Sequence, residues 1–205
     1  MATLPHARTR TSVIAAPPVD SRSDAELVAL AKADLRAFAL LYARYVDPVH
    51  RYCYRRLGNR EAAEDATSLV FMKALAAFAR FHDTSFRAWL FTIAHNVVTD
   101  RYRAAPADQP LEWAFGLTDP APSPEDHALA ADHRRDLSLL LTQLPEHQRQ
   151  VVELRLAGLS GAEIAGVMGR SPANVNVTQS RAKARLRELL NSRSGTQGEH
   201  HGDNH

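Results

Sequence analysis

One stretch of the sequence cannot belong to a continuous helix. Residues 104–124, AAPADQPLEWAFGLTDPAPSP, contain five prolines and neither lysine nor arginine. Proline inside a helix removes a backbone hydrogen bond and clashes with the preceding turn. We therefore predict a flexible, Pro-rich acidic linker at residues 105–123. It divides the chain into two units, residues 24–104 and 124–191, which we expect the linker to hold apart.

The C-terminal unit contains two predicted helices with a very short connection. Ser160 and Glu163 have the spacing of a capping box, which marks the start of a helix. Gly169 supplies a left-handed stop, and Ser171 followed by Pro172 starts the next helix at once. This layout predicts a helix-turn-helix.

The second of these helices is strongly cationic. Residues 170–193 contain six Lys or Arg and one acid, a charge of 6 − 1 = +5, whereas the whole chain carries +2. Its apolar residues would pack inward and leave amides, hydroxyls and cations outward. Such a face suits contact with phosphates and with base edges in a major groove. A solvated amphipathic helix in a bundle is the alternative, but two capped helices with a tight turn favour DNA binding.

The N-terminal unit is also predicted to be helical. The pattern indicates a short helix at residues 24–31, helical segments from residue 35 to 57 with Gly58 as their stop, a helix capped by Asn59, and another at residues 86–103. We therefore predict an all-α fold with an N-terminal helical bundle and a C-terminal helix-turn-helix domain. Residues 1–23 are predicted to be a flexible extension, and residues 192–205, which show no apolar periodicity, a disordered tail.

The helix after Asn59 has two contrasting faces. One face is apolar and is predicted to be core, with Ala63, Ala66, Val70, Ala74, Ala77 and Phe81. The opposite face carries Glu64, Asp65, Ser68, Leu69 and Lys73. An exposed leucine among charged side chains indicates contact with a partner.

The helix at residues 86–103 carries a line of three larger side chains. Trp89, Asn96 and Arg103 stand seven residues apart and so fall within about 20° of one line along the helix. An aromatic ring, an amide and a cation in a row could stack on an unpaired base and hold its backbone. The alternative, which spacing alone leaves open, is that Trp89 belongs to the core.

Composition excludes several classes of protein. The single cysteine, Cys53, rules out an internal disulfide framework and a multi-cysteine zinc site. No apolar run is long enough to cross a membrane, and there is no phosphate-cradling glycine loop, zinc-protease motif or nucleophile elbow. We expect a cytoplasmic protein that is not an enzyme, with no cofactor, no metal and no membrane contact.

Three motifs in series resemble the extracytoplasmic function (ECF) class of bacterial sigma factors. They are EDATSLVFMKAL, SFRAWLFTIAHNVVTDRYR and LPEHQRQVVELRLAGLSGAEIAGVMGRSPANV followed by SRAKARLREL. The resemblance covers residues 24–190. It implies a subunit that binds core RNA polymerase, at the clamp of the largest subunit and the flap of the second-largest, and that recognises promoter DNA. It also implies an anti-sigma factor as a partner.

The resemblance implies three groups of site residues. The promoter −10 element, as a single strand, is expected to contact Phe81, His82, Asp83, Thr84, Ser85, Trp89, Asn96 and Arg103. The −35 element, as a duplex, is expected to contact Arg170, Asn174, Asn176, Val177, Ser180, Arg181 and Lys183. Core polymerase is expected to contact Asp65, Ser68, Leu69, Phe71 and Lys73. Some relatives carry basic residues at the positions of Asn176 and Thr178, so −35 recognition here is expected to rest more on amide contacts and DNA shape.

A stand-alone helix-turn-helix regulator remains the alternative function. In that case residues 24–103 would form a sensor or dimerisation domain, and the protein would bind duplex DNA without polymerase.

Overall fold

The computed structural model describes residues 20–82, 85–104 and 137–198. Within these ranges every regular element is helical, which confirms the predicted all-α fold. The first 19 residues and the predicted linker at residues 105–123 lie outside the described part of the chain. No helix in that part is both long and apolar enough to cross a membrane.

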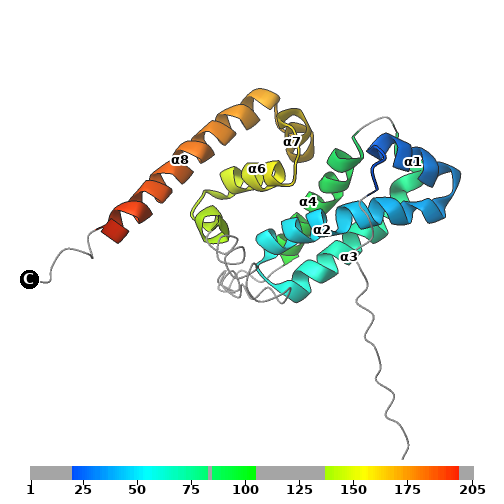
Figure 1. The fold of residues 1–205 in the computed structure, drawn as a ribbon, viewed down its shortest axis with the longest axis horizontal. Coiled ribbons are helices and arrows are strands. Elements are labelled where there is room, and N and C mark those ends of the chain that lie inside the picture. The colour runs from blue at the N-terminus through cyan, green and yellow to red at the C-terminus, as the bar shows by residue number, and fades with distance from the viewer. Residues whose placement is uncertain (1–19, 83–84, 105–136, 199–205) are drawn as a thin grey trace, which may run out of the picture.

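The N-terminal unit is a bundle of helices in which α2, α3 and α4 lie side by side (Figure 1). Its elements are α1 (Asp24–Ala33), the 3₁₀ turn η1 (Leu35–Ala37), α2 (Phe38–Leu57), α3 (Arg60–Ala77), the 3₁₀ turn η2 (Phe78–Arg80) and α4 (Phe86–Ala104). Gly58 ends α2 in the left-handed conformation (φ 67°), and the side chain of Asn59 caps α3, both as predicted.

The start of α2 differs from the expectation. Asp34 caps the 3₁₀ turn η1, and the α-helix begins only at Phe38. The helix then passes through Pro48 without a break. A proline inside a helix costs about 3 kcal/mol. Packing against the other helices must offset this cost, since Val49, Tyr52 and Cys53 after the proline are fully buried.

The C-terminal unit contains the predicted helix-turn-helix. A short helix at residues 137–142 leads to α6 (Glu146–Leu156), α7 (Gly161–Met168) and α8 (Pro172–Gly198). Ser160 and Glu163 form the capping box of α7, and Gly169 ends it in the left-handed conformation (φ 60°).

The predicted disordered tail is wrong for residues 192–198. The helix α8 continues to Gly198, and Figure 1 shows its C-terminal end projecting beyond the other helices. The reason is that residues 185–198 lack proline, so nothing interrupts the hydrogen bonding of the backbone even where apolar periodicity has ended. Residues 199–205 lie outside the described part of the chain.

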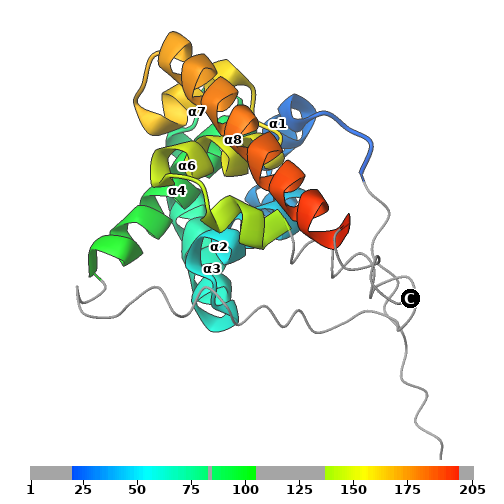
Figure 2. The ribbon, with the colours of Figure 1, turned by 90° about the vertical axis from the view of Figure 1, so that its left-hand side faces the viewer.

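The two units pack against each other instead of lying apart. The helix α7 lies on α4, and α6 lies on α2 (Figures 1 and 2). Val151, Leu154, Leu159 and Ile164 of the C-terminal unit belong to the same continuous core as the N-terminal bundle. We call this the closed arrangement. The expectation of two separated units is therefore corrected: each unit has an apolar face that the other covers.

Charged side chains are buried where the units meet. Arg56 of α2 contacts Glu146 of α6, with 2.5 Å from Nη2 to Oε1, and its Nε lies 3.5 Å from Glu153 Oε2. The side chains of Arg56 and Glu153 are each 1% exposed. Burial raises the pKa of Glu153 to about 7, although the nearby guanidinium groups of Arg56 and Arg149 favour its charged form.

The raised pKa of Glu153 predicts a pH dependence of stability. The folded protein binds more protons than the unfolded chain between the ordinary carboxyl pKa of 4.5 and about 7. The free energy of unfolding therefore contains a contribution that falls as pH rises through this window. Its slope is up to about 1.4 kcal/mol per pH unit.

The test compares thermal unfolding of the wild type and Glu153→Gln between pH 5 and 7. Burial lowers the pKa of His95 below its ordinary value of 6.5, which gives a slope of the opposite sign, so the difference between the two proteins is the readout. We expect the wild type to lose stability relative to the variant as pH rises. Parallel curves would show that Glu153 is charged at all these pH values.

Candidate DNA- and polymerase-binding surfaces

The predicted −10 residue Phe81 lies in the core. Its ring is 5% exposed and packs against Trp89, at 4.9 Å between ring centroids, and against Phe86 at 5.7 Å. Its carbonyl oxygen accepts a hydrogen bond of 2.6 Å from Lys32 Nζ. The Phe81 ring is therefore not accessible to a flipped base in the closed arrangement, and its assignment to the −10 element stays a prediction. The ring faces inward because Phe81, the residue that follows η2, continues the apolar side of α3 toward the core.

The other −10 residues fall into two groups. His82 and Ser85 are exposed, whereas Asp83 and Thr84 lie outside the described part of the chain. On α4, Asn96 and Arg103 are exposed, and Trp89 is half-buried with one side against Phe81 and Phe86. The Trp89 ring thus packs on the core and still reaches the surface, and its stacking on an unpaired base stays a prediction.

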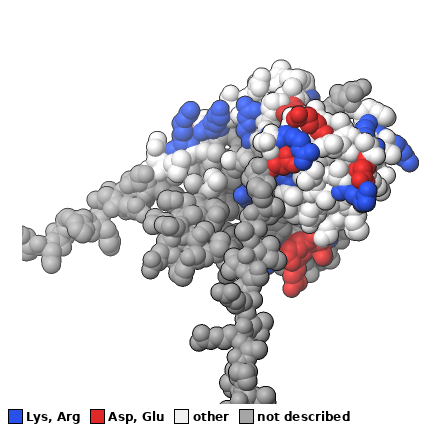
Figure 3. Space-filling view, turned by 45° about the vertical axis from the view of Figure 1, so that its right-hand side comes forward, with Lys and Arg blue, Asp and Glu red and all other residues white. Residues whose placement is uncertain are grey.

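The predicted −35 residues share one exposed surface. All seven, Arg170, Asn174, Asn176, Val177, Ser180, Arg181 and Lys183, are exposed, while Val175, Thr178 and Ala182 face the core. The alternation follows from the helical period, as predicted. Within the described residues, no ion pair involves Arg170, Arg181 or Lys183. In Figure 3, Lys and Arg side chains follow one another along the edge where α8 lies, without acidic side chains between them.

The predicted polymerase-binding residues lie on α3. Asp65, Ser68 and Lys73 are exposed and Leu69 is half-buried. Phe71 is only 6% exposed, and its ring packs edge-on against Tyr42 at 4.7 Å, so in this structure it offers little surface to a partner. Phe71 lies three residues after Ser68, but the helical rotation places it on the side that faces α2.

Sequence reasoning missed the apolar part of this α3 surface. Met72 is 62% exposed and Leu75 is 44% exposed. Met72 follows Ser68 by four residues, and Leu75 follows Ser68 by seven. The signal that could have found them is the i, i+4 relation between Ser68 and Met72, which places the methionine one turn along the same face.

Sequence reasoning also missed contacts between the −10 surface and the helix-turn-helix. Partial burial raises the pKa of Glu163 on α7, but the nearby Ser85 side chain, the Ser160 backbone and the charge of Arg87 lower it overall. Arg87 Nη1 donates a hydrogen bond of 3.0 Å to the carbonyl oxygen of Gly158. In the closed arrangement, part of the predicted −10 surface is therefore in contact with the C-terminal unit.

Comparisons with known proteins agree with the fold and the motifs. Residues 41–106 match the sigma-70 region 2 family and residues 134–186 match the sigma-70 region 4 family. The ECF RNA polymerase sigma factor BldN of Streptomyces coelicolor is 38% identical over 179 residues, covering 83% of this chain and 67% of BldN. The ECF RNA polymerase sigma factor ShbA of Streptomyces griseus is 36% identical, covering 68% of this chain and 80% of ShbA.

Two solved structures share the fold. CnrH in complex with the cytosolic domain of CnrY superposes with a TM-score of 0.62 at 29% identity, covering 82% of this chain and 97% of CnrH. The sigma factor RpoE in complex with the anti-sigma factor NepR from Bartonella quintana gives a TM-score of 0.61 at 23% identity, covering 75% of this chain and 96% of RpoE.

The chain belongs to the ECF class of RNA polymerase sigma factors. The family carries two regions in the order that the sequence motifs predict, and the structure places them in the two packed units. Its function is that of a sigma factor in transcription initiation, and its relatives are initiation factors rather than enzymes.

Neighbouring residues on α3 separate a structural role from a binding role. Phe71→Ala should lower the free energy of unfolding by about 3–5 kcal/mol, because it leaves a cavity in the core. Met72→Ala should change it by less than about 0.5 kcal/mol, because the side chain is exposed. Urea unfolding of both variants measures the difference. Equal effects of the two substitutions would contradict the burial described above.

Proposed function

We propose that this protein binds core RNA polymerase, reads a −35 element as duplex DNA and holds the melted strand of a −10 element. The observation that carries this proposal is the exposed face of α8. Arg181 and Lys183 on this face, and Arg170 just before the helix, have no ion-pair partner among the described residues, while the opposite side of the helix is buried. Cations left without protein partners are available to DNA phosphates.

The helix-turn-helix supplies the geometry for duplex recognition. In this motif the first helix braces the backbone and the N-terminal part of the second helix enters the major groove. Here α8 begins at Pro172, and the backbone N–H of Asn174 donates to Ser171 Oγ at 3.3 Å. The exposed amides of Asn174 and Asn176 lie within the first turns of α8, where base edges come within reach. We assign them to base contact and Arg181 to a phosphate.

Arg181→Ala tests the phosphate assignment. The variant should bind −35 duplexes of any sequence more weakly, because a phosphate contact carries no sequence information. The slope of log affinity against log salt concentration should fall by about one phosphate contact. The measurement is binding of polymerase holoenzyme to promoter DNA over a salt series, with Arg36→Ala, an exposed arginine on η1, as the control. A slope that equals that of the control would remove Arg181 from the interface.

The −10 strand is proposed to bind along α4. Asn96 and Arg103 are exposed on this helix, and the accessible side of Trp89 lies two turns before Asn96. Taking a base out of its stack costs a few kcal/mol, which stacking and hydrogen bonds to the base must offset. In the closed arrangement Phe81 and Phe86 support the Trp89 ring from behind.

Asn96→Ala tests the melted-strand assignment. The variant should form fewer open complexes on templates with a −10 element, because the flipped base loses a hydrogen-bond partner. Binding to core polymerase should remain nearly unchanged, since α3 is untouched. Permanganate reactivity of unpaired thymines reports melting, and co-elution with core polymerase serves as the control. Unchanged melting would exclude Asn96 from the pocket.

Reading both elements requires the closed arrangement to open. The two elements are about 25 base pairs apart, which is about 85 Å at 3.4 Å per base pair. Two small domains in direct contact cannot span that distance, since a 60-residue domain has a radius of gyration of about 10 Å. The 136 − 104 = 32 residues between α4 and residue 137 can reach about 105 Å when extended. We therefore propose that polymerase binds the open form.

A protein partner that controls this opening is part of the proposal. The related CnrH structure contains the cytosolic domain of CnrY bound to it. We propose that an anti-sigma factor binds this chain as well. The alternative of a stand-alone regulator predicts that the purified chain alone protects a palindromic site on DNA. Protection that requires core polymerase supports the sigma factor instead.

A further inference from the structure

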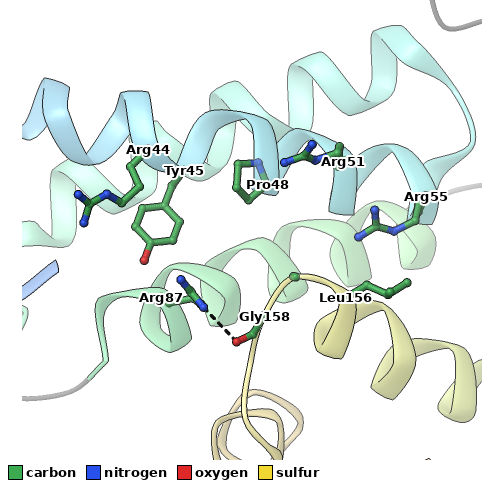
Figure 4. Close-up of a pocket in the computed structure, with 9 residues that line it drawn as sticks. Arg44, Tyr45, Pro48, Arg51, Arg55, Arg87, Leu156 and Gly158 are labelled. Atoms are coloured by element: carbon green, nitrogen blue, oxygen red, sulfur yellow. Dashed lines mark hydrogen bonds between the residues drawn. The ribbon is translucent and has the colours of Figure 1, made fainter. Parts of the chain in front are cut away.

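A crevice lined by four arginines lies where the two units meet. Three of the arginines, Arg44, Arg51 and Arg55, are on α2, and Arg87 is on α4. The opposite wall is the chain segment Leu156, Ala157 and Gly158 between α6 and α7. Figure 4 shows the guanidinium groups arranged along the space in front of this segment. We call it the arginine crevice, and its volume is about 230 Å³.

The positive charge of the crevice is only partly balanced. Arg44 pairs with Asp24 at 2.7 Å, and Arg87 donates to the Gly158 carbonyl. Within the described residues, no hydrogen bond or ion pair involves the side chains of Arg51 and Arg55. The Nε atom of Arg55 is buried without a hydrogen-bond partner. Burial lowers the pKa of Arg55, and the neighbouring charge of Arg51 lowers it further despite the opposing effect of Glu153.

Arg55 is half-buried, and its Nε atom is shielded from water without a hydrogen-bond partner, which is energetically unfavourable. Burying a charged group costs several kcal/mol unless hydrogen bonds and an opposite charge compensate. Guanidinium groups bind phosphate oxygens through paired N–H donors more effectively than ammonium groups do. One water occupies about 30 Å³ in the liquid, so the crevice can hold an anion of several heavy atoms.

We propose that the arginine crevice binds a polyphosphate group, either as a free inorganic anion or as part of a nucleotide. None of its four arginines belongs to the DNA-binding or polymerase-binding residues assigned above. The bound anion would accept hydrogen bonds from Arg51 and Arg55 and offset the repulsion among the guanidinium groups. The site is separate from promoter recognition and goes beyond the proposed function.

The bound anion favours the closed arrangement. All four arginines belong to the N-terminal unit, but Arg55 is desolvated because Leu156 and its neighbours cover it. In the open form water would solvate Arg55, and pairing with an anion would then stabilise it less. A ligand shifts an equilibrium only through different affinities for the two states. The desolvation of Arg55 provides that difference, because charge interactions are stronger away from water.

Calorimetric titration of the full chain with sodium tripolyphosphate at physiological salt tests the site. We expect one saturable site, which Arg51→Ala weakens about tenfold through loss of a charge-assisted hydrogen bond. Arg36→Ala is the matched control, because it removes the same charge from a side chain that is 92% exposed and outside the crevice. It should change the affinity less than about twofold, as expected for screened surface charge. Absence of saturable binding, or equal effects of the two variants, would overturn the proposal.

Titration with ATP separates the two sources of the polyphosphate. Tighter binding of ATP than of tripolyphosphate identifies a nucleotide, and equal binding identifies the polyphosphate group alone. Both results support the site.

A substitution in the other unit tests the link to the closed arrangement. Leu156→Asp places a carboxylate opposite the arginines, so it should compete with tripolyphosphate and weaken its binding about tenfold or more. Val177→Asp introduces the same charge at an exposed position on α8, away from the crevice, and should have little effect. Equal affinities of the two variants would show that the anion binds without the C-terminal wall and would overturn the link.

Discussion

The closed arrangement depends on a buried cluster of charges inside an apolar interface. Arg56 reaches from α2 between Glu146 and Glu153 of the C-terminal unit, and apolar side chains of both units surround the cluster. The burial of apolar surface holds the units together. The charged groups oppose it, since several nitrogen and oxygen atoms of Arg56 and Glu153 are buried without a hydrogen-bond partner. Separation would return these atoms to water, so the same interface that closes the protein also lowers the cost of opening it.

An interface of this kind suits a protein that must work in two arrangements. Promoter reading needs α4 and α8 far apart, whereas the structure shows Ser85 and Arg87 of the N-terminal unit in contact with the turn and start of α7. Closing therefore brings the C-terminal unit next to the surface proposed for the −10 strand, and the short distance between the units prevents simultaneous contact with both elements. Polymerase, a sequestering partner or an anion in the arginine crevice can each shift the balance by binding one arrangement better.

Local features were predictable from the sequence, and contacts distant in sequence were not. The capping box of α7 and the glycine stops after α2 and α7 follow from residue types within a few positions, and the structure has all of them. The exposed face of α8 follows from helical period alone. The burial of Phe81 was predictable from its place on the apolar face of α3, whereas the burial of Phe71 depends on Tyr42 of α2, which is distant in sequence. The sequence also did not predict the docking of the two units. The apolar faces of α4 and α7 are each consistent with the core of their own unit, so the pattern gives no sign that they contact each other.

A reversible cross-link between the units measures the central claim most directly. The side chains of Ser85 and Glu163 approach each other across the interface, so the double substitution Ser85→Cys and Glu163→Cys is the natural pair for a disulfide there. The native Cys53 is buried, and burial raises its thiol pKa to about 11, so it should not interfere. In transcription with reconstituted polymerase, we predict that the oxidised protein is inactive and that reduction restores activity to the level of the wild type. Equal promoter-dependent transcription by the oxidised and reduced forms would contradict the claim that the protein must open to function.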